Sequence, residues 1–350
     1  MPKFFMWLML WFMAVWYGLK VLFNILKECC LVGCRKVFHW KVISRPACLD
    51  DPTLGTHGFL DLKDVTIHYV ASGPEGGPLM LFVHGFPEFW FSWRHQIREF
   101  QKDYRVVAID QRGYGESSKP KGKKAYVMNA LVSDLKQVIE ALGYQSCTLV
   151  AHDWGGVVVW PFARLHPQMV DKLIVLNAPP GPVFQNVLKK NKKQLKMSWY
   201  MFFFQLPYLP EVWARVCDLE VIDCMFGGKH SRISGFPVIY KTPTPFTEEE
   251  IAAYKYTYCQ PGSITAPINY YRASLQLPQE KINYDLDYDM PVLLIWGCQD
   301  LALCKEIPEE TKKMNPKITV RYIEEGGHFV QMDTPELVNS AIREWLHRQK

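Results

Sequence analysis

The segment Thr-Leu-Val-Ala-His-Asp-Trp-Gly-Gly at residues 148–156 constrains the fold more than any other part of this chain. An apolar run ends at Ala151, Asp153 follows, and Gly155 and Gly156 open an apolar stretch of helical character. Small residues around one reactive side chain are what a tight strand-to-helix turn needs, because bulkier neighbours would clash. The segment predicts a nucleophile elbow with Asp153 where serine is usual. On its own it also fits a buried strand that ends at a helix N-cap aspartate.

The identity of the elbow residue restricts the chemistry. A carboxylate can attack carbon and form an ester, but it cannot perform serine-type acyl transfer. The residues downstream of Asp153 therefore decide between a nucleophile and a capping residue.

The bulk composition suits one catalytic α/β domain with an insertion. The chain has 350 residues, of which 49% are hydrophobic and 14% aromatic, and a formal net charge of +5. A solvated helix face explains the one lysine cluster better than nucleic-acid binding does; it comprises Lys189, Lys190, Lys192, Lys193 and Lys196. Ten scattered cysteines without a C-x-x-C pair favour a reduced compartment over a disulfide framework.

The N-terminal segment is apolar and long. Phe4 to Leu19 carries no charge, and the apolar character resumes from Val21 to Leu26. A helix of about 20 such residues can cross a bilayer, and no small-residue cleavage site follows. We therefore expect an uncleaved, single-pass signal-anchor. The aromatic residues Trp7, Trp11, Trp16 and Tyr17 leave a helix lying in the membrane interface as the alternative.

The charges around this segment predict its orientation. Positive residues follow it at Lys27, Arg35, Lys36, Lys41 and Arg45, whereas Lys3 alone precedes it. The positive-inside rule then places the catalytic domain in the cytosol. Cys29, Cys30 and Cys34 are candidates for palmitoylation.

From Thr56 onward, strand and helix patterns alternate. Strands are expected at 59–63, 65–70, 79–83, 104–109, 147–151, 173–176, 292–296 and 318–323, and helices at 92–100, 127–142, 155–165 and 335–347. Such alternation predicts an α/β fold with a mainly parallel sheet flanked by helices. We expect an anchor and basic linker at 1–55, a first core part at 56–182, a mainly helical cap at 183–288, and a second core part at 289–350.

Two loops follow expected strands of the core. His84-Gly85-Phe86-Pro87-Glu88 forms a sharp loop that can point the N–H of Phe86 into the site, and together with the N–H of Trp154 it would make an oxyanion hole. In the loop from Asp110 to Ser117 we expect a structural role, with Arg112 pairing with acidic neighbours.

A histidine and an acid complete the set. His328 lies on a glycine-rich loop after the last expected strand and is a candidate general base. Asp300, four residues beyond the strand at 292–296, is its candidate orienting acid. The chain order of Asp153, Asp300 and His328 is that of enzymes built on a nucleophile elbow.

At this point the sequence resembles the epoxide hydrolases of the α/β-hydrolase family, from about Thr56 to the C-terminus. The resemblance rests on residues 84–88, on residues 151–156, and on Gly327-His328-Phe329 with Gln331-Met332-Asp333. It implies an α/β-hydrolase fold with a helical cap inserted before the last two strands. With the N-terminal segment, the chain looks like the short membrane-anchored members, which implies a place in the endoplasmic reticulum membrane and in lipid metabolism. The chain departs from many members at Phe329, where they carry Trp, and Asp300 lies in a looser acidic turn.

The resemblance also implies the roles of the site residues. Tyr200 and Tyr271 would donate hydrogen bonds to the epoxide oxygen, with Tyr270 a competing choice for the second donor. Asp153 would attack a ring carbon and form a hydroxyalkyl ester. His328, oriented by Asp300, would activate the water that hydrolyses it, and the N–H groups of Phe86 and Trp154 would hold the oxyanion. Trp154, Phe86, Pro87 and Trp199 would line the substrate site.

The implied substrate is a small lipophilic epoxide, such as an epoxy fatty acid, and the implied reaction needs no metal or organic cofactor. One rival is a haloalkane dehalogenase, which typically carries Asn where this chain has Phe86 and has no use for two phenolic donors. Another is a non-enzymatic binding protein of the same fold, for which a complete set of nucleophile, acid and base would be unnecessary.

Overall fold

The computed structural model describes residues 3–228, 233, 245–279 and 287–349. They form two compact units. The sheet unit is drawn from residues 51–121, 125–195 and 279–350, and the helical unit from residues 1–50, 122–124 and 196–278. Parts of the expected cap, at 229–232, 234–244 and 280–286, lie outside the described residues. The expected domain boundaries at 55, 182 and 288 stay predictions.

The sheet unit is built on eight strands in the order β1-β2-β4-β3-β5-β6-β7-β8. Neighbours from β4 to β8 pair in parallel, whereas β1 with β2 and β2 with β4 are antiparallel. The strands are β1 (Thr56–Asp61), β2 (Thr66–Ser72), β3 (Leu79–Val83), β4 (Arg105–Ile109), β5 (Cys147–His152), β6 (Val170–Leu176), β7 (Val292–Gly297) and β8 (Thr319–Ile323). The expected α/β fold with a mainly parallel sheet is thus confirmed.

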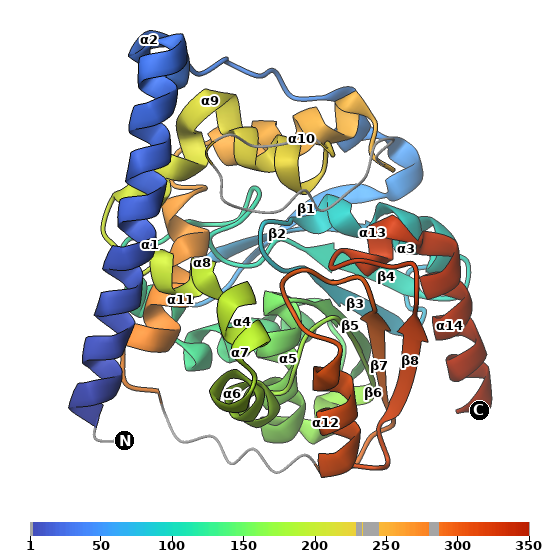
Figure 1. Ribbon diagram of the computed structural model, residues 1–350. Helices are drawn as coiled ribbons and strands as arrows, with labels where there is room; N and C mark the ends of the chain where they lie inside the picture. The colour runs from blue at the N-terminus through green and yellow to red at the C-terminus, as the bar shows by residue number, and fades with distance from the viewer. Residues whose placement is uncertain (1–2, 229–232, 234–244, 280–286, 350) are drawn as a thin grey trace. The chain divides into compact units, whose positions relative to one another are not determined.

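Helices cover both faces of this sheet (Figure 1). α3 (Arg94–Phe100) packs with α14 (Pro335–Arg348), and α4 (Met128–Ala141) packs with α5 (Trp154–Leu165). The unit also holds α6 (Gly181–Lys190), α12 (Glu306–Met314) and α13 (Val330–Asp333), and α7 (Lys192–Met197) runs to its boundary. Every residue of β3, β5 and β7 is buried, which explains why these strands read as continuous apolar runs.

The expected elements are close to the observed ones, with differences at β6, which begins three residues earlier than expected, at the first hairpin and at one helix. The first hairpin turns through Leu62–Val65, where the amide of Leu62 bonds to the carbonyl of Val65 at 2.9 Å, and Asp61 pairs with Thr66. The helix expected from residue 92 begins at Arg94, because a short 3-10 turn at Trp90–Trp93 precedes it.

The helical unit contains α1 (Lys3–Val32), α2 (Cys34–Val37), α8 (Trp199–Phe203), α9 (Leu209–Met225), α10 (Glu248–Cys259) and α11 (Thr265–Gln276). α10 begins with a capping box, in which Thr247 and Glu250 each accept a hydrogen bond from the other's backbone amide. α9 is interrupted at Val216–Leu219, where three residues have positive φ. One described helix is long and apolar enough to cross a membrane, namely α1, over Trp7–Val32 with a mean hydropathy of 1.6.

Candidate active site

The candidate nucleophile lies on a strained turn between β5 and α5. Asp153 has φ 47° and ψ −119°, a backbone conformation that costs about 1–3 kcal/mol in a non-glycine residue. The glycines around it permit this turn. A Cβ at Gly85 would lie 2.4 Å from Cβ of Asp153, and a Cβ at Gly155 would lie 2.2 Å from the carbonyl oxygen of Val83. The small residues seen in the sequence are therefore required by close approaches of backbone and side chain.

The structure brings Asp153, His328 and Asp300 together at the carboxyl edge of the sheet. Nε2 of His328 lies 3.6 Å from Oδ2 of Asp153, and its Nδ1 hydrogen-bonds to Oδ2 of Asp300 at 2.7 Å. β5, β7 and β8 run parallel, so the loops that follow them meet at this edge. The arrangement can support nucleophilic attack by a carboxylate followed by base-assisted hydrolysis.

The other oxygen of the nucleophile is held by the loop after β3. The backbone N–H of Phe86 donates to Oδ1 of Asp153 at 2.7 Å. Trp154 is the first residue of α5, so its N–H belongs to the first turn of the helix, where amides have no intrahelical acceptor. Pro87 follows Phe86 through a cis peptide bond. Phe86 and Trp154 thus flank the nucleophile as the sequence predicts for an oxyanion hole, whose role stays a prediction.

The charges of this site are coupled. Burial raises the pKa of Asp153, but the hydrogen bond and positive charge of His328 outweigh it, so that the pKa is lowered overall. Burial lowers the pKa of His328, yet the carboxylates of Asp300 and Asp153 raise it well above its ordinary value. Both shifts favour an ionised Asp153 beside a protonated His328.

Backbone amides and an asparagine fix the orienting acid. Oδ1 of Asp300 accepts the N–H groups of Ala302 and Leu303 at 2.7 and 2.8 Å, and Oδ2 accepts Nδ2 of Asn177 at 2.7 Å. Asn177 is buried at the end of β6, and its Oδ1 accepts the N–H of Gly297 at 2.8 Å. These hydrogen bonds therefore fix the carboxylate of Asp300 toward His328, although the turn that carries Asp300 departs from the sequence of many family members.

A second buried network links the three loops of the site, and sequence reasoning gave its members no role. Glu88 accepts hydrogen bonds from the N–H of Gly85 at 2.7 Å and from Gln331 at 2.6 Å, and it bonds to Nδ1 of His152 at 2.6 Å. Nε2 of His152 contacts the carbonyl of His328 at 2.8 Å. Glu88, His152 and Gln331 are fully buried. The sequence signal that could have identified these three residues is that each is polar and lies at the end of an apolar strand or in the segment that follows one.

A neutral histidine stiffens the loop that carries Phe86. Burial lowers the pKa of His84, although Asp110, Glu88 and other neighbours raise it in part. Nδ1 of His84 contacts the carbonyl of Gly85 at 2.8 Å, and its Nε2 accepts the N–H of Gln111 at 3.1 Å. These contacts hold the loop in place for the N–H of Phe86.

Two predicted residues of the helical unit lie side by side. The rings of Tyr200 on α8 and Tyr271 on α11 meet edge to face with centroids 5.8 Å apart, and Phe204 contacts both. Trp199 packs against Tyr200 and against Trp213. Tyr270, the competing second donor, is fully buried.

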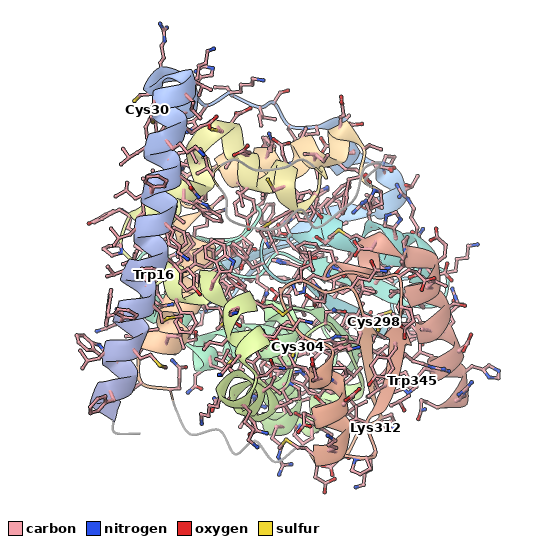
Figure 2. All side chains as sticks on the ribbon, viewed as in Figure 1. Trp16, Cys30, Cys298, Cys304, Lys312 and Trp345 are labelled. Carbon is pink, nitrogen blue, oxygen red and sulfur yellow. The ribbon has the colours of Figure 1, made fainter. Side chains whose placement is uncertain are left out.

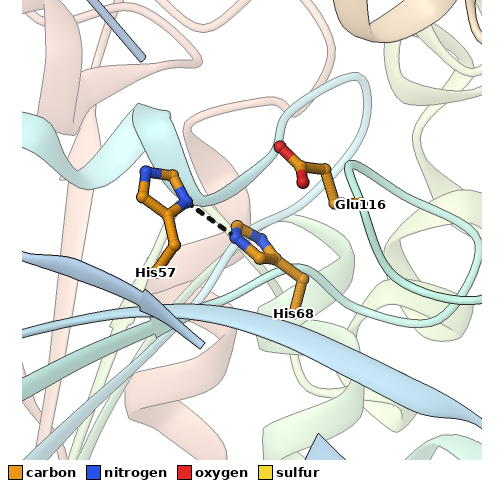
Figure 3. Close-up of side chains that lie close together, drawn as sticks. All are labelled: His57, His68 and Glu116. Carbon is orange, nitrogen blue, oxygen red and sulfur yellow. Dashed lines mark hydrogen bonds between the residues drawn. The ribbon is translucent and has the colours of Figure 1, made fainter. Parts of the chain in front are cut away.

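One group of described residues has ligand atoms close enough to hold a metal ion: His57, His68 and Glu116, all within 4.8 Å (Figure 3). Nδ1 of His57 and Nε2 of His68 hydrogen-bond at 2.9 Å, and Nδ1 of His68 bonds to Asp110 at 2.8 Å. Two nitrogens on one tetrahedral zinc, each at about 2.0–2.1 Å, would be roughly 3.3 Å apart. The two rings thus bind one another, and the network joins β1, β2 and the loop after β4.

Comparison with known proteins agrees with this geometry. The family described as alpha/beta hydrolase fold matches residues 78–206. The chain is 40% identical to epoxide hydrolase 4 of Mus musculus over 87% of this chain and 83% of that protein. It is 42% identical to epoxide hydrolase 1 of Caenorhabditis elegans over 90% of this chain and 75% of that protein.

Solved structures show the same likeness. An epoxide hydrolase of Bacillus megaterium in complex with an inhibitor is 35% identical, with a TM-score of 0.68 over 83% of this chain and all of that chain. Epoxide hydrolase A of Mycobacterium thermoresistibile is 28% identical, with a TM-score of 0.72 over 83% of this chain and 98% of that chain. The chain belongs to the epoxide hydrolases of the α/β-hydrolase fold.

Proposed function

We propose that this protein converts lipophilic epoxides to vicinal diols through a covalent ester on Asp153. The observation that carries the proposal is the carboxylate at the elbow, with one oxygen bound by the N–H of Phe86 and the other facing a histidine–aspartate pair. This arrangement supports two steps, alkylation of a carboxylate and hydrolysis of the resulting ester.

The contacts of Asp153 assign its two oxygens different tasks. Oδ2 attacks one ring carbon, its bond to that carbon forms as the ring C–O bond breaks, and Tyr200 and Tyr271 stabilise the oxygen that becomes an alkoxide. Their adjacent rings on α8 and α11 support this shared role. Oδ1, held by Phe86, becomes the carbonyl oxygen of the ester.

Hydrolysis then uses the histidine. Ester formation removes the negative charge of Asp153, which is one of the causes that raise the pKa of His328. The pKa of His328 therefore falls once the ester has formed, and its proton goes to the alkoxide, which becomes the first hydroxyl of the product. The neutral imidazole, held by Asp300, then takes a proton from water. The hydroxide adds to Cγ, and the amides of Phe86 and Trp154 bind the oxyanion on Oδ1. The Cγ–Oδ2 bond breaks, and the departing alkoxide takes the proton of the new carboxylic acid at Asp153, which releases the diol and restores the carboxylate.

The substrate class and the cellular site belong to the same proposal. The aromatic cluster of Trp199, Phe203, Phe204 and Trp213 in the helical unit suits an apolar substrate such as an epoxy fatty acid. α1 attaches the protein to a membrane, which we place at the endoplasmic reticulum with the catalytic domain on the cytosolic side, because the basic residues that follow α1 suit the anionic cytosolic leaflet.

The proposal is tested by detecting the covalent ester on Asp153. The His328→Gln variant mixed with an epoxy fatty acid should form one equivalent of ester without turnover, seen by intact-protein mass spectrometry as one added substrate mass on the peptide that contains Asp153. The Asp153→Asn variant should show none. In the wild type, turnover in ¹⁸O-water should place ¹⁸O in the Asp153 carboxylate, because water attacks Cγ. Diol formation with neither adduct nor isotope in Asp153 would contradict the proposal, and halide release from a haloalkane without diol would assign a different activity.

A further inference from the structure

One face of α1 is covered inside the helical unit. Ala14, Gly18, Val21, Ile25 and Glu28 are buried and recur at spacings of four and three residues, which places them on one stripe of the helix. This stripe faces α8 and α9, against which α1 packs (Figure 1). A helix that crossed a bilayer on its own would expose this stripe to lipid, so the observed packing and an isolated span are incompatible.

The contacts along this stripe are close. A Cβ at Gly18 would lie 2.3 Å from Cδ1 of Leu206, and the ring of Tyr17 packs against that of Trp199 at 5.8 Å between centroids. Trp199 and Tyr200 are neighbours on α8. α1 therefore supports the helix that carries the proposed oxygen donor Tyr200.

The opposite face of α1 is apolar and exposed. Phe5, Phe12, Leu19 and Leu26 recur every seven residues and are each more than half exposed. Phe23 and Trp16, the latter labelled in Figure 2, widen the same face. An apolar surface of this length on a folded protein marks an interaction site. We call this set of six residues the outer face.

The position of Lys20 argues against a spanning helix. Lys20 is exposed and lies in the middle of Trp7–Val32, so in a spanning helix its ammonium group would reach the centre of the hydrocarbon, where a charge is costly. Lys20 packs over the rings of Trp16 and Tyr17, with its nitrogen 4.8 and 5.8 Å from their centroids. Along a helix that lies flat, the same ammonium group reaches the lipid headgroups.

The distribution of the aromatic residues along α1 also argues against a spanning helix. Spanning helices gather Trp and Tyr at their two ends, at the headgroup level. Here Trp7, Trp11, Trp16 and Tyr17 are spread along the first half of α1, so several would lie within the hydrocarbon of a span. A helix in the plane of the membrane leaves Tyr17 packed on Trp199 and keeps the exposed Trp7 and Trp16 at the interface.

We infer that α1 lies in the plane of the membrane as a fixed part of the helical unit, with its outer face inserted into one leaflet of a phospholipid bilayer. The insertion depth of such a helix is about 5–10 Å. The exposed Lys20, Lys27, Arg35 and Lys36 favour a leaflet with anionic headgroups. The inference rests on the membrane attachment proposed above, and it places the helix that supports Tyr200 beside the lipid phase.

Topology is tested with acceptor sites for N-glycosylation. The natural chain has no Asn-x-Ser/Thr site, so a site added at either end of the full chain reports on that end alone. In microsomes, we expect the protein to stay in the membrane pellet at high salt with neither site modified. Modification of either site would establish a span and overturn the inference. Cleavage behind α1 that releases the rest of the chain from the membrane would overturn it as well. A secretory leader fused in front of α1 serves as the control that both sites can be modified.

The docking surface is tested by charge. Phe12→Glu, Leu19→Glu and Phe23→Glu combined should reduce sedimentation of the full-length protein with phosphatidylcholine–phosphatidylserine vesicles at least tenfold. Leu337→Glu, an exposed apolar position on α14, should leave sedimentation unchanged. Equal vesicle binding by the triple variant would exclude the outer face as the docking surface. Diol formation from a water-soluble epoxide, measured in parallel, reports on the catalytic proposal independently.

The packing of α1 is tested by size. Gly18→Leu places a larger side chain against Leu206 and should lower the melting temperature of the full-length protein in detergent. Val15→Leu, on an exposed position, should not. A helix that left the helical unit to span the bilayer would tolerate both changes equally, and that result would contradict the inference.

Discussion

At the scale of single residues, the candidate site is a set of coupled charges around His328. Asp153 and Asp300 both face His328, at 3.6 and 2.7 Å, and both raise its pKa. In the proposed reaction, only Asp153 loses its charge when the ester forms. We therefore expect His328 to be protonated before that step and to act as a base after it.

This coupling predicts the titration of His328. Asp153→Asn keeps the acceptor for the N–H of Phe86 but removes the charge, so the pKa of His328 should fall by about one unit or more. The sign follows because a nearby anion stabilises the imidazolium and extends its range toward higher pH. An NMR titration of the imidazole resonances measures the shift, with the exposed Asp287→Asn as the control. An unchanged pKa would mean that Asp300 alone sets it.

The paired rings of the helical unit give a second residue-scale prediction. Tyr271→Phe and Tyr200→Phe each remove one proposed donor to the epoxide oxygen, and each should lower the rate of ester formation by about 10²–10³-fold, as loss of one oxyanion donor does. Tyr270→Phe, the adjacent position on the same helix, should have little effect. Stopped-flow tryptophan fluorescence measures the step. A larger loss at Tyr270 than at Tyr271 would reverse the assignment.

At the scale of elements, the site depends on loops fixed by buried polar pairs at the strand ends. In the loop after β4, Nε and Nη2 of Arg112 each donate to Asp134 on α4 at 2.5 Å, and Nη1 donates to the carbonyl of Ala125 at 2.7 Å. The predicted structural role of Arg112 beside an acidic partner is confirmed. Burial raises the pKa of Asp134, and Arg112 offsets this only in part.

This ion pair predicts an asymmetric effect on stability. Asp134→Ala leaves the guanidinium of Arg112 buried without its carboxylate, and the free energy of unfolding should fall by about 3–5 kcal/mol. In the double variant Arg112→Met with Asp134→Leu, which removes both charges, most of that stability should return. Urea unfolding measures both. A double variant as unstable as Asp134→Ala would show that Arg112 contributes mainly through Ala125.

At the scale of the whole molecule, buried carboxylates set the acid limit of stability. Burial raises the pKa of Asp110, but hydrogen bonds from His68 and from the amide of Trp90 outweigh it and lower the pKa to about 2. A group whose pKa is depressed on folding stabilises the protein above its unfolded pKa, and that contribution disappears as the pH falls through the folded pKa.

The size of this contribution is about 2 kcal/mol, from a shift of nearly two units. Asp110→Asn should therefore lower stability at neutral pH by about this amount and flatten the loss of stability between about pH 4 and pH 2. Unfolding by urea at a series of pH values measures the curve. Asp171→Asn, at an exposed position on β6, should leave it unchanged, and an equally steep acid limb in Asp110→Asn would assign the loss to other carboxylates.

The sequence by itself determined the fold class and the residues that meet at the carboxyl edge of the sheet. Fully buried strands such as β3 and β5 read as unbroken apolar runs, and a strained turn next to a nucleophile requires small neighbours such as Gly155. These signals are local, because steric and burial constraints act between residues close in the chain. The chain order of Asp153, Asp300 and His328 matched that of enzymes built on a nucleophile elbow, and the parallel strands bring the loops of these residues to one edge.

Only the tertiary structure decided the contacts between segments distant in sequence. The network of Glu88, His152 and Gln331 spans 243 residues of chain, and the packing of α1 on α8 joins the N-terminus to a helix near residue 200. Neither feature produces a periodic pattern in the sequence, because a buried hydrogen bond or a covered helix face depends on which distant segment of the chain packs against it. The sequence of an apolar helix is similar whether lipid or protein covers a given face. Only the tertiary structure shows which face of α1 packs against protein.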